Sequence, residues 1–105
     1  MDPNVNTPDS SWIIYILRCK DGSLYTGICR DIKRRLHEHN NLKSGARYTR
    51  TRRPVKLVYL ELAPSRSAAA QREYRIKLLT PEQKRCLIRQ QGIAMPDTLD
   101  TRVVD

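Results

Sequence analysis

A predicted β-hairpin near the start of the chain constrains the fold more than any other feature of the sequence. The segment from Trp12 to Cys19 is rich in β-branched and aromatic residues, which predicts a strand buried on both faces. The segment from Leu24 to Cys29 predicts a second strand, and Asp21-Gly22 between the two predicts a tight turn. We therefore expect two adjacent antiparallel strands.

The length of the turn decides on which faces the two tyrosines of the hairpin lie. A strict two-residue turn would place Tyr15 and Tyr25 on opposite faces. A three-residue loop from Lys20 to Gly22, with a bulge at its glycine, would pair Tyr15 with Gly27 and place both tyrosines on one face. Gly27 would then leave space for a ring that lies across the strand. We expect this second register, which two rings on opposite faces would refute.

The rest of the chain predicts one more strand and three helices, in the order helix, strand, helix, helix. The expected ranges are 31–40, 55–62, 65–79 and 80–92, and a basic connector at 42–54 has room for one short helical turn. The full order β-β-α-β-α-α predicts an α+β fold, in which a three-stranded antiparallel sheet is flanked by helices. We expect this domain at residues 12–92, between flexible tails at 1–11 and 93–105.

Local patterns support these ranges. Asp31 can cap the first helix, and Thr80 with Gln83 forms a capping box in which Pro81 occupies the first helical position. The alternation of the third strand predicts one shared face for Val55, Leu57, Tyr59 and Glu61.

The positive charge of the chain is concentrated in its middle. Lys and Arg number 20 against 11 Asp and Glu, which gives a net charge of +9. The stretch from Arg30 to Lys56 alone holds ten basic and two acidic residues, a net charge of +8. Such a stretch is either a solvated surface or a contact for a polyanion, and we favour nucleic acid as the partner.

The three cysteines, Cys19, Cys29 and Cys86, are odd in number and form no C-x-x-C pair. This usage favours reduced thiols in a cytoplasmic protein over a disulfide scaffold or a zinc site. We expect all three side chains to be small hydrophobic members of the core.

Two polar residues of the first helix lie at the edge of its apolar stripe. Helical geometry places Arg35 and His39 beside Ile32 and Leu36. A half-buried guanidinium needs an anion, which is either a carboxylate of the protein or a bound phosphate. His37 lies two residues from His39, the wrong spacing for two ligands on one helix face, and this excludes a paired-histidine metal site.

Glu73 has a similar place on the helix at 65–79. It lies beside the apolar stripe that contains Ala69 and Ile76. A carboxylate at the edge of a core is either paired or coordinates a metal. Lys77, four residues further on, offers an ordinary helical ion pair, so the spacing leaves both interpretations open.

Together these residues resemble the GIY-YIG nuclease superfamily. Ile13-Ile14-Tyr15 and Tyr25-Thr26-Gly27 look like its two signature tripeptides, and Arg35 lies ten residues after Tyr25, where the family has its catalytic arginine. His39, Thr49 and Glu73 also match the family pattern. The resemblance covers about residues 12–79, and in size the chain is most similar to the small stand-alone bacterial members of the YhbQ/YazA type, which are UPF0213-like.

The resemblance implies metal-dependent hydrolysis of DNA phosphodiester bonds, in repair or processing. Glu73 would hold Mg²⁺ or Mn²⁺, and Arg35 would bind the scissile phosphate. Tyr25 would be the general base, Tyr15 would position the water, and His39 would hydrogen-bond to Tyr25 or to phosphate. Double-stranded or branched DNA would bind with low sequence specificity, through contacts to its backbone. The residues expected to contact DNA are Arg30, Arg34, Lys43, Arg47, Thr49, Arg50, Arg52 and Arg53.

An alternative is a nucleic-acid-binding module with a vestigial or weak nuclease site. It is suggested by two departures from the family pattern. Ile28 follows Gly27 where some members carry a lysine, and no asparagine follows Glu73. A purely structural protein–protein role is disfavoured, because Arg35 and Glu73 would then have no reason to converge.

Overall fold

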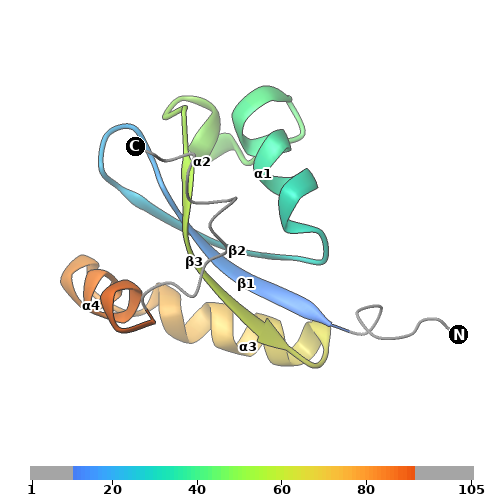
Figure 1. Cartoon of the computed structure of the whole chain (residues 1–105), viewed down its shortest axis with the longest axis vertical. Helices are drawn as coiled ribbons and strands as arrows, with labels where there is room; N and C mark the ends of the chain where they lie inside the picture. The colour runs from blue at the N-terminus through green and yellow to red at the C-terminus, as the bar shows by residue number, and fades with distance from the viewer. Residues whose placement is uncertain (1–10, 92–105) are drawn as a thin grey trace, which may run out of the picture.

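The computed structural model describes residues 11–91 (Figure 1). The elements in chain order are β1 (Trp12–Arg18), β2 (Leu24–Cys29), α1 (Ile32–Asn41), α2 (Arg47–Arg50), β3 (Lys56–Ala63), α3 (Arg66–Lys77) and α4 (Pro81–Gln91). This arrangement confirms the predicted α+β fold, with α2 as the short helical turn of the basic connector. The predicted tails, apart from Ser11, and the predicted helix end at Gly92 lie outside the described residues.

The sheet has the strand order β2-β1-β3, and both pairings are antiparallel. The helices α1 and α2 lie on one side of it, and α3 and α4 lie on the other (Figure 1). Because β1 is the central strand, its residues from Ile14 to Leu17 are at most 1% exposed. The prediction of a strand buried on both faces is therefore confirmed.

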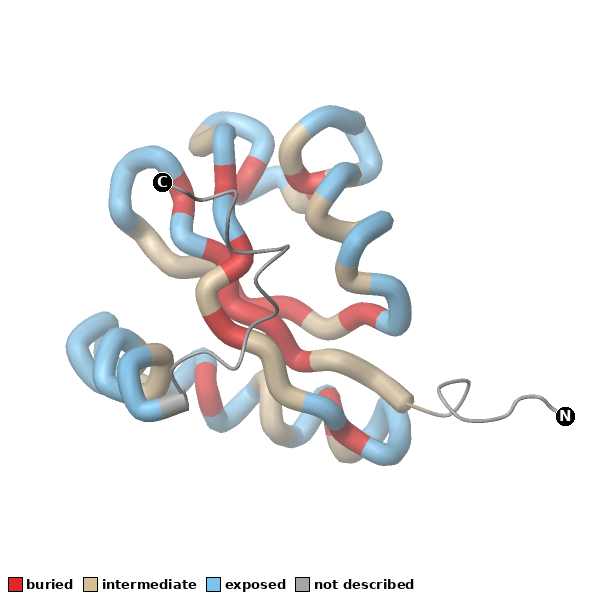
Figure 2. The backbone as a smooth tube through the Cα atoms, in the orientation of Figure 1, coloured by how far each residue is buried: buried red, intermediate tan, exposed pale blue. Residues whose placement is uncertain are grey.

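The central sheet separates two hydrophobic clusters, and buried backbone concentrates along it (Figure 2). Ile14 and Ile16 pack with residues of α3 such as Ala69 and Ile76. On the opposite face Tyr15 and Leu17 belong to a second cluster, against which α1 packs through Ile32 and Leu36. The alternation of β1 thus supplies both layers of the core.

The hairpin has the predicted register. Tyr15 pairs with Gly27 and Leu17 pairs with Tyr25, so the two tyrosines share a face. The amide of Cys19 donates to the carbonyl of Ser23 at 2.8 Å. Gly22 has a φ of +87°, which a residue with a Cβ adopts only with strain.

The alternation predicted for the third strand is wrong, because β3 contains an irregularity. Ile16 pairs with Tyr59, whereas the next residue of β1, Leu17, pairs with Leu57. The residue between the two, Val58, is therefore an extra residue in β3. As a result, Leu57 packs in the cluster of Tyr15 while Tyr59 packs in the cluster of Ile14 on the other face.

The predicted helix caps are present. The Asp31 carboxylate accepts from the amide of Arg34 at 3.1 Å. Thr80 and Gln83 exchange the two hydrogen bonds of a capping box at the start of α4.

The prediction for the cysteines is correct for Cys19 and Cys29, which are buried, and wrong for Cys86, which is exposed. Cys86 lies on the outer side of α4, since its neighbours Leu87 and Ile88 are the ones that pack against the core.

No helix within residues 11–91 combines the length and the apolar character that crossing a membrane requires.

Candidate active site

Four polar side chains from four different elements meet on the α1 side of the sheet. Tyr15 comes from β1, Tyr25 from β2, His39 from α1 and Thr49 from α2. The His39 ring lies 5.8 Å from the Tyr15 ring and 5.2 Å from the Tyr25 ring, measured between centroids. Tyr15, His39 and Thr49 are almost fully buried, at no more than 1% exposure. We call these four residues the tyrosine–histidine cluster.

A chain of hydrogen bonds runs through this cluster and fixes its protons. The Thr49 hydroxyl donates to the carbonyl of Ala46 at 2.9 Å. Its oxygen must therefore accept from Nδ1 of His39, which lies 2.8 Å away. With the ring proton on Nδ1, Nε2 of His39 is an acceptor, and it takes the hydroxyl proton of Tyr15 at 2.8 Å. His39 therefore bonds to Tyr15, not to Tyr25 as the resemblance suggested.

Both titratable members of the chain are held in their neutral forms. Burial raises the pKa of Tyr15 above its usual range, and the neighbouring Arg35 guanidinium only partly offsets this effect. Burial, with the positive charge of Arg35, lowers the pKa of His39 to about 4. At neutral pH the pair is thus a phenol that donates to an uncharged imidazole.

Gly27 is required by the position of the Tyr15 ring. A Cβ at this glycine would lie 2.5 Å from Oη and 2.7 Å from Cζ of Tyr15. Such distances are far inside van der Waals contact. The expectation that Gly27 makes room for a ring across the strand is confirmed.

Arg35 lies at the edge of the cluster, with its side chain 27% exposed. Its Nη1 donates to the Glu38 carboxylate at 2.8 Å and to the carbonyl of Ser44 at 3.0 Å. The protein thus supplies the anion that a half-buried guanidinium needs. A guanidinium has five N–H donors, and Arg35 also interacts with the Tyr15 hydroxyl, so a bound phosphate would share these donors with Tyr15.

Tyr48 extends the cluster toward the surface and was missed in the sequence. Its ring stacks on Tyr25 with centroids 5.9 Å apart and an interplanar angle of 24°. The Arg52 guanidinium lies 3.9 Å from the centroid of the Tyr48 ring and pairs with Asp21 at 3.1 Å. The available signal was an aromatic residue between arginines in the basic connector.

Glu73 is not joined to the tyrosine–histidine cluster. It belongs to α3, on the other side of the sheet, and Lys77 contacts its Oε2 at 3.1 Å. Of the two interpretations left open by the spacing, the helical ion pair is therefore formed. Within the described part of the chain, no hydrogen bond or ion pair links Glu73 to Tyr15 or Tyr25.

The donor chemistry of Glu73 fits one largely hydrated hard cation. Its side chain is half-buried, and Lys77 contacts only one of its two carboxylate oxygens. Among residues 11–91 no three His, Cys, Asp or Glu side chains are grouped as a metal site. A cation held by Glu73 would therefore take its other ligands from water and from substrate, as Mg²⁺ commonly does.

Most of the residues expected to contact DNA also make contacts within the protein. Arg34, Lys43, Arg47 and Arg50 are exposed around α1 and α2, although Arg34 pairs with Glu38 at 3.4 Å and Arg50 donates to the carbonyl of Lys43 at 3.3 Å. Arg30 lies over the Trp12 ring, Arg52 lies over Tyr48, and Thr49 is buried in the cluster.

Arg53 is also engaged, because its guanidinium donates to carbonyls at the end of α1, those of Glu38, His39 and Leu42. The structure thus corrects the expectation of DNA contact for Thr49, whose hydroxyl is inaccessible. Arg53 caps the C-terminal end of α1.

Comparison with known families identifies the class of this domain. A family model described as the GIY-YIG catalytic domain matches residues 11–85. The chain belongs to the GIY-YIG family, a family of nucleases, and the resemblance seen in the sequence is confirmed.

Known relatives share much of the sequence, and a solved relative shares the fold. A UPF0213 protein of Desulfotalea psychrophila is 53% identical over 87 residues, which cover 83% of this chain and 77% of that protein. One of Staphylococcus saprophyticus is 53% identical over 75 residues, covering 71% of this chain and 90% of that protein. The solution structure of a UPF0213 protein of Bacillus halodurans matches with a TM-score of 0.55 and 38% identity, over 90% of this chain and 97% of that one.

Proposed function

We propose that this chain is a metal-dependent endonuclease that hydrolyses DNA phosphodiester bonds, in repair or processing. The observation that carries the proposal is the buried hydrogen-bond chain from Thr49 through His39 to Tyr15, beside Tyr25 and Arg35. Buried polar groups destabilise a fold unless they are paired, and a core of this size could be filled by apolar side chains at lower cost. A hydrogen-bond chain with fixed protons beside a half-buried arginine is better explained by a catalytic role than by packing alone.

The hydrogen-bond chain gives Tyr15 a defined role. Because its hydroxyl proton is directed to Nε2 of His39, Tyr15 Oη can only accept further hydrogen bonds, one from Arg35 and another from a water molecule. Tyr15 would thus orient the attacking water, and Tyr25 on the same face would take its proton. Arg35 would bind the non-bridging phosphate oxygens through its N–H donors.

Glu73 would hold the divalent cation, Mg²⁺ or Mn²⁺, and when bound such a cation neutralises charge on a phosphate and stabilises a leaving oxygen. Because Glu73 lies on the α3 side of the sheet and pairs with Lys77, this role requires the ion pair to open and the substrate to contact both sides of the sheet. The exposed basic residues Arg34, Lys43, Arg47 and Arg50 would contact the phosphates of double-stranded or branched DNA. Contacts of this kind carry little sequence information, and the affinity should fall steeply as the salt concentration rises.

A second candidate is a DNA-binding module with a weak or vestigial nuclease site. It is favoured by one observation. Arg35 and Glu73 are each paired with a neighbour on their own helix, Glu38 and Lys77. Both ion pairs would have to open or share their charges when a phosphate and a cation bind.

The two functions are separated by cleavage of plasmid, single-stranded and branched DNA with Mg²⁺ or Mn²⁺. The variants are Tyr25→Phe, Arg35→Ala and Glu73→Gln, and the matched control is Glu82→Gln, an exposed glutamate of α4. The nuclease is supported if wild type and control cleave while the three site variants are slower by at least a hundredfold. It is rejected in favour of the binding module if wild type cleaves no faster than Glu73→Gln although both bind DNA.

A further inference from the structure

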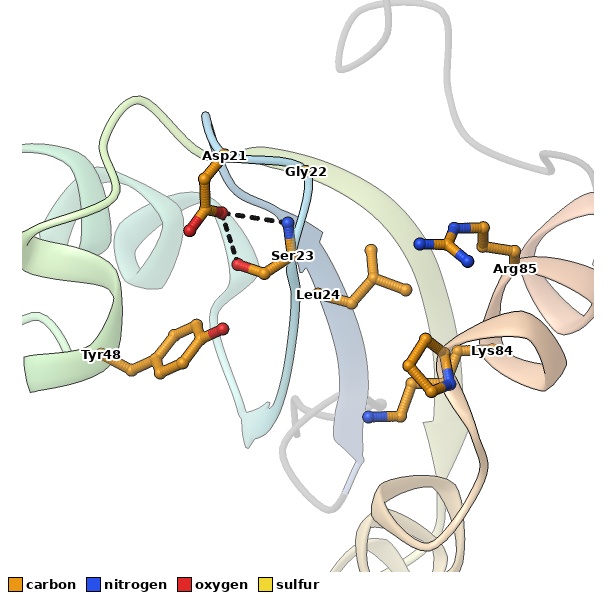
Figure 3. A pocket seen from close by; sticks show the side chains of 8 residues that line it. Asp21, Gly22, Ser23, Leu24, Tyr48, Lys84 and Arg85 are labelled. Atoms are coloured by element: carbon orange, nitrogen blue, oxygen red, sulfur yellow. Dashed lines mark hydrogen bonds between the residues drawn. The ribbon is translucent and has the colours of Figure 1, made fainter.

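A second recessed site borders the Tyr48 ring. It is a pocket of about 360 Å³ between the hairpin loop, α2 and the start of α4 (Figure 3). Its lining residues are Asp21, Gly22, Ser23, Leu24, Tyr48, Pro81, Lys84 and Arg85. We call it the hairpin pocket, and the function proposed above makes no use of it.

The acidic group of the hairpin pocket is already paired. The Asp21 carboxylate accepts from the amide of Ser23 at 3.0 Å and from its hydroxyl at 2.6 Å, and it pairs with Arg52 at 3.1 Å. These hydrogen bonds and the Arg52 charge lower the pKa of the Asp21 carboxyl. Asp21 is thus a stable anion that holds the loop and does not need the basic groups across the pocket.

The basic groups of the pocket are not paired. Lys84 and Arg85 reach from α4 toward the hairpin, across from the Tyr48 hydroxyl (Figure 3). Among residues 11–91 neither side chain has a hydrogen bond or an ion pair, although Lys84 is partly buried. A partly buried ammonium is a favourable place for an anion, and the Arg85 guanidinium adds positive charge to the same pocket.

The hairpin pocket adjoins the tyrosine–histidine cluster through Tyr48. Tyr48 is a wall of the pocket, and the same ring stacks on Tyr25 with centroids 5.9 Å apart. One nucleotide of a strand advances by about 3.4 Å along a duplex axis. A strand whose scissile phosphate lies beside Tyr25 would therefore bring a phosphate one or two nucleotides away to the pocket.

We propose that the hairpin pocket binds the phosphate and sugar of a flanking nucleotide of the DNA strand that is cut. Lys84 and Arg85 contact the phosphate, the Tyr48 hydroxyl donates to it or to the sugar, and Leu24 and Pro81 pack against the sugar. A volume of about 360 Å³ is within the range of small-ligand sites. This inference rests on the proposed function, because it requires a DNA strand at Tyr25.

The first test measures binding to a fluorescent DNA duplex in EDTA, so that cleavage plays no part. The double variant Lys84→Ala/Arg85→Ala is compared with Arg75→Ala/Arg89→Ala, which removes the same charge from exposed positions outside the pocket. We expect the pocket variant to bind about tenfold more weakly, and its slope of log affinity against log salt to fall by about one, as for one lost phosphate contact. The control should change affinity less than twofold. Thermal unfolding confirms that both variants fold.

The second test is a ¹⁵N–¹H NMR titration of the wild-type chain with a 5′-phosphorylated DNA trinucleotide. We expect saturable shifts of the Gly22, Ser23 and Lys84 amides that are lost in Lys84→Ala/Arg85→Ala. If inorganic phosphate binds with the same affinity as the trinucleotide, the pocket is a site for free phosphate and the proposed nucleotide subsite is wrong. An RNA trinucleotide that binds where the DNA one does not would overturn the assignment to DNA.

The two proposals fail in different ways. If wild type binds and cleaves DNA while the pocket and control variants bind equally well, the hairpin pocket is not a subsite and the nuclease stands. If wild type binds duplex DNA without cleaving it and the pocket variant binds more weakly, the pocket is a DNA contact but the nuclease function fails. If wild type binds no DNA and the trinucleotide causes no shifts, both proposals are wrong.

Discussion

Replacement of Gly27 by alanine tests the geometry on which the candidate site depends. The new Cβ would lie 2.5 Å from Oη and 2.7 Å from Cζ of Tyr15. The Tyr15 ring has little freedom to withdraw, because it is 1% exposed and its hydroxyl is bound to His39 at 2.8 Å. Overpacking costs about 1–3 kcal/mol and the loss of the Tyr15–His39 hydrogen bond about 1 kcal/mol more. We therefore expect the free energy of unfolding to fall by about 2–4 kcal/mol.

Urea unfolding, followed by circular dichroism, measures this change from the shift in midpoint at constant slope. Gly22→Ala is the matched control. A Cβ at Gly22 would meet no atom within 4 Å, but the φ of +87° disfavours a side chain. This control should lose only about 1 kcal/mol, through backbone strain alone. If Tyr15 orients the attacking water as proposed, Gly27→Ala should also lower kcat for DNA cleavage.

A double-mutant cycle separates the steric effect from a general loss of stability. Tyr15→Phe removes Oη, the atom closest to the new Cβ, so it should relieve part of the clash. The combined loss in Tyr15→Phe/Gly27→Ala should be smaller than the sum of the two single losses by at least about 1 kcal/mol. The reasoning is refuted if Gly27→Ala costs less than about 0.5 kcal/mol, or if the two single effects simply add.

Three further predictions concern the residues around Tyr15. The pKa of His39 is about 4 in the folded protein and 6.5 in the unfolded chain. Between these two pH values the unfolded state binds more protons than the folded state. The free energy of unfolding should therefore fall as the pH is lowered from 6.5 to 4, by at most about 3 kcal/mol. In His39→Gln the urea midpoint should depend less on pH between these values. An unchanged dependence would show that His39 is not the group responsible. Thr49→Val should leave Nδ1–H of His39 unpaired and cost about 1–3 kcal/mol, whereas Thr49→Ser should retain the Nδ1–H tautomer in ¹⁵N NMR spectra. Arg53→Ala should lower the free energy of unfolding by about 1–2 kcal/mol, because it removes the cap of α1. Arg47→Ala, at an exposed position, should weaken DNA binding without changing stability. Equal unfolding midpoints for the two variants would argue against the cap.

The hairpin shows how far local sequence information reaches. The register that places Tyr15 opposite Gly27 followed from the turn residues and from the two-residue period of a strand, both of which act over short distances along the chain. The caps at Asp31 and Thr80 were predictable for the same reason. Helical geometry also placed His39 at the buried stripe of α1, and it is fully buried.

The errors concern features that depend on how separate elements meet. The irregularity at Val58, which moves Tyr59 to the other face of the sheet, arises where β3 fits against β1. The assignment of Thr49 to DNA contacts was wrong because the way α2 packs on α1 buries its hydroxyl beside His39. Nothing in the local sequence around either residue carries this information.

The sequence by itself determined the helices and strands and the shared face of the two tyrosines. It also determined that Arg35 and His39 lie beside the apolar stripe of the same helix. Turns, caps and periodicity act between near neighbours in the chain, which is why these features were predictable. Only the tertiary structure decided that His39 bonds to Tyr15, 24 residues away. It also decided that Tyr48 stacks on Tyr25 and that Glu73 pairs with Lys77 on the other side of the sheet. Contacts of this kind depend on the packing of whole elements, in which one hydrogen bond or ring contact is chosen among several that the sequence allows.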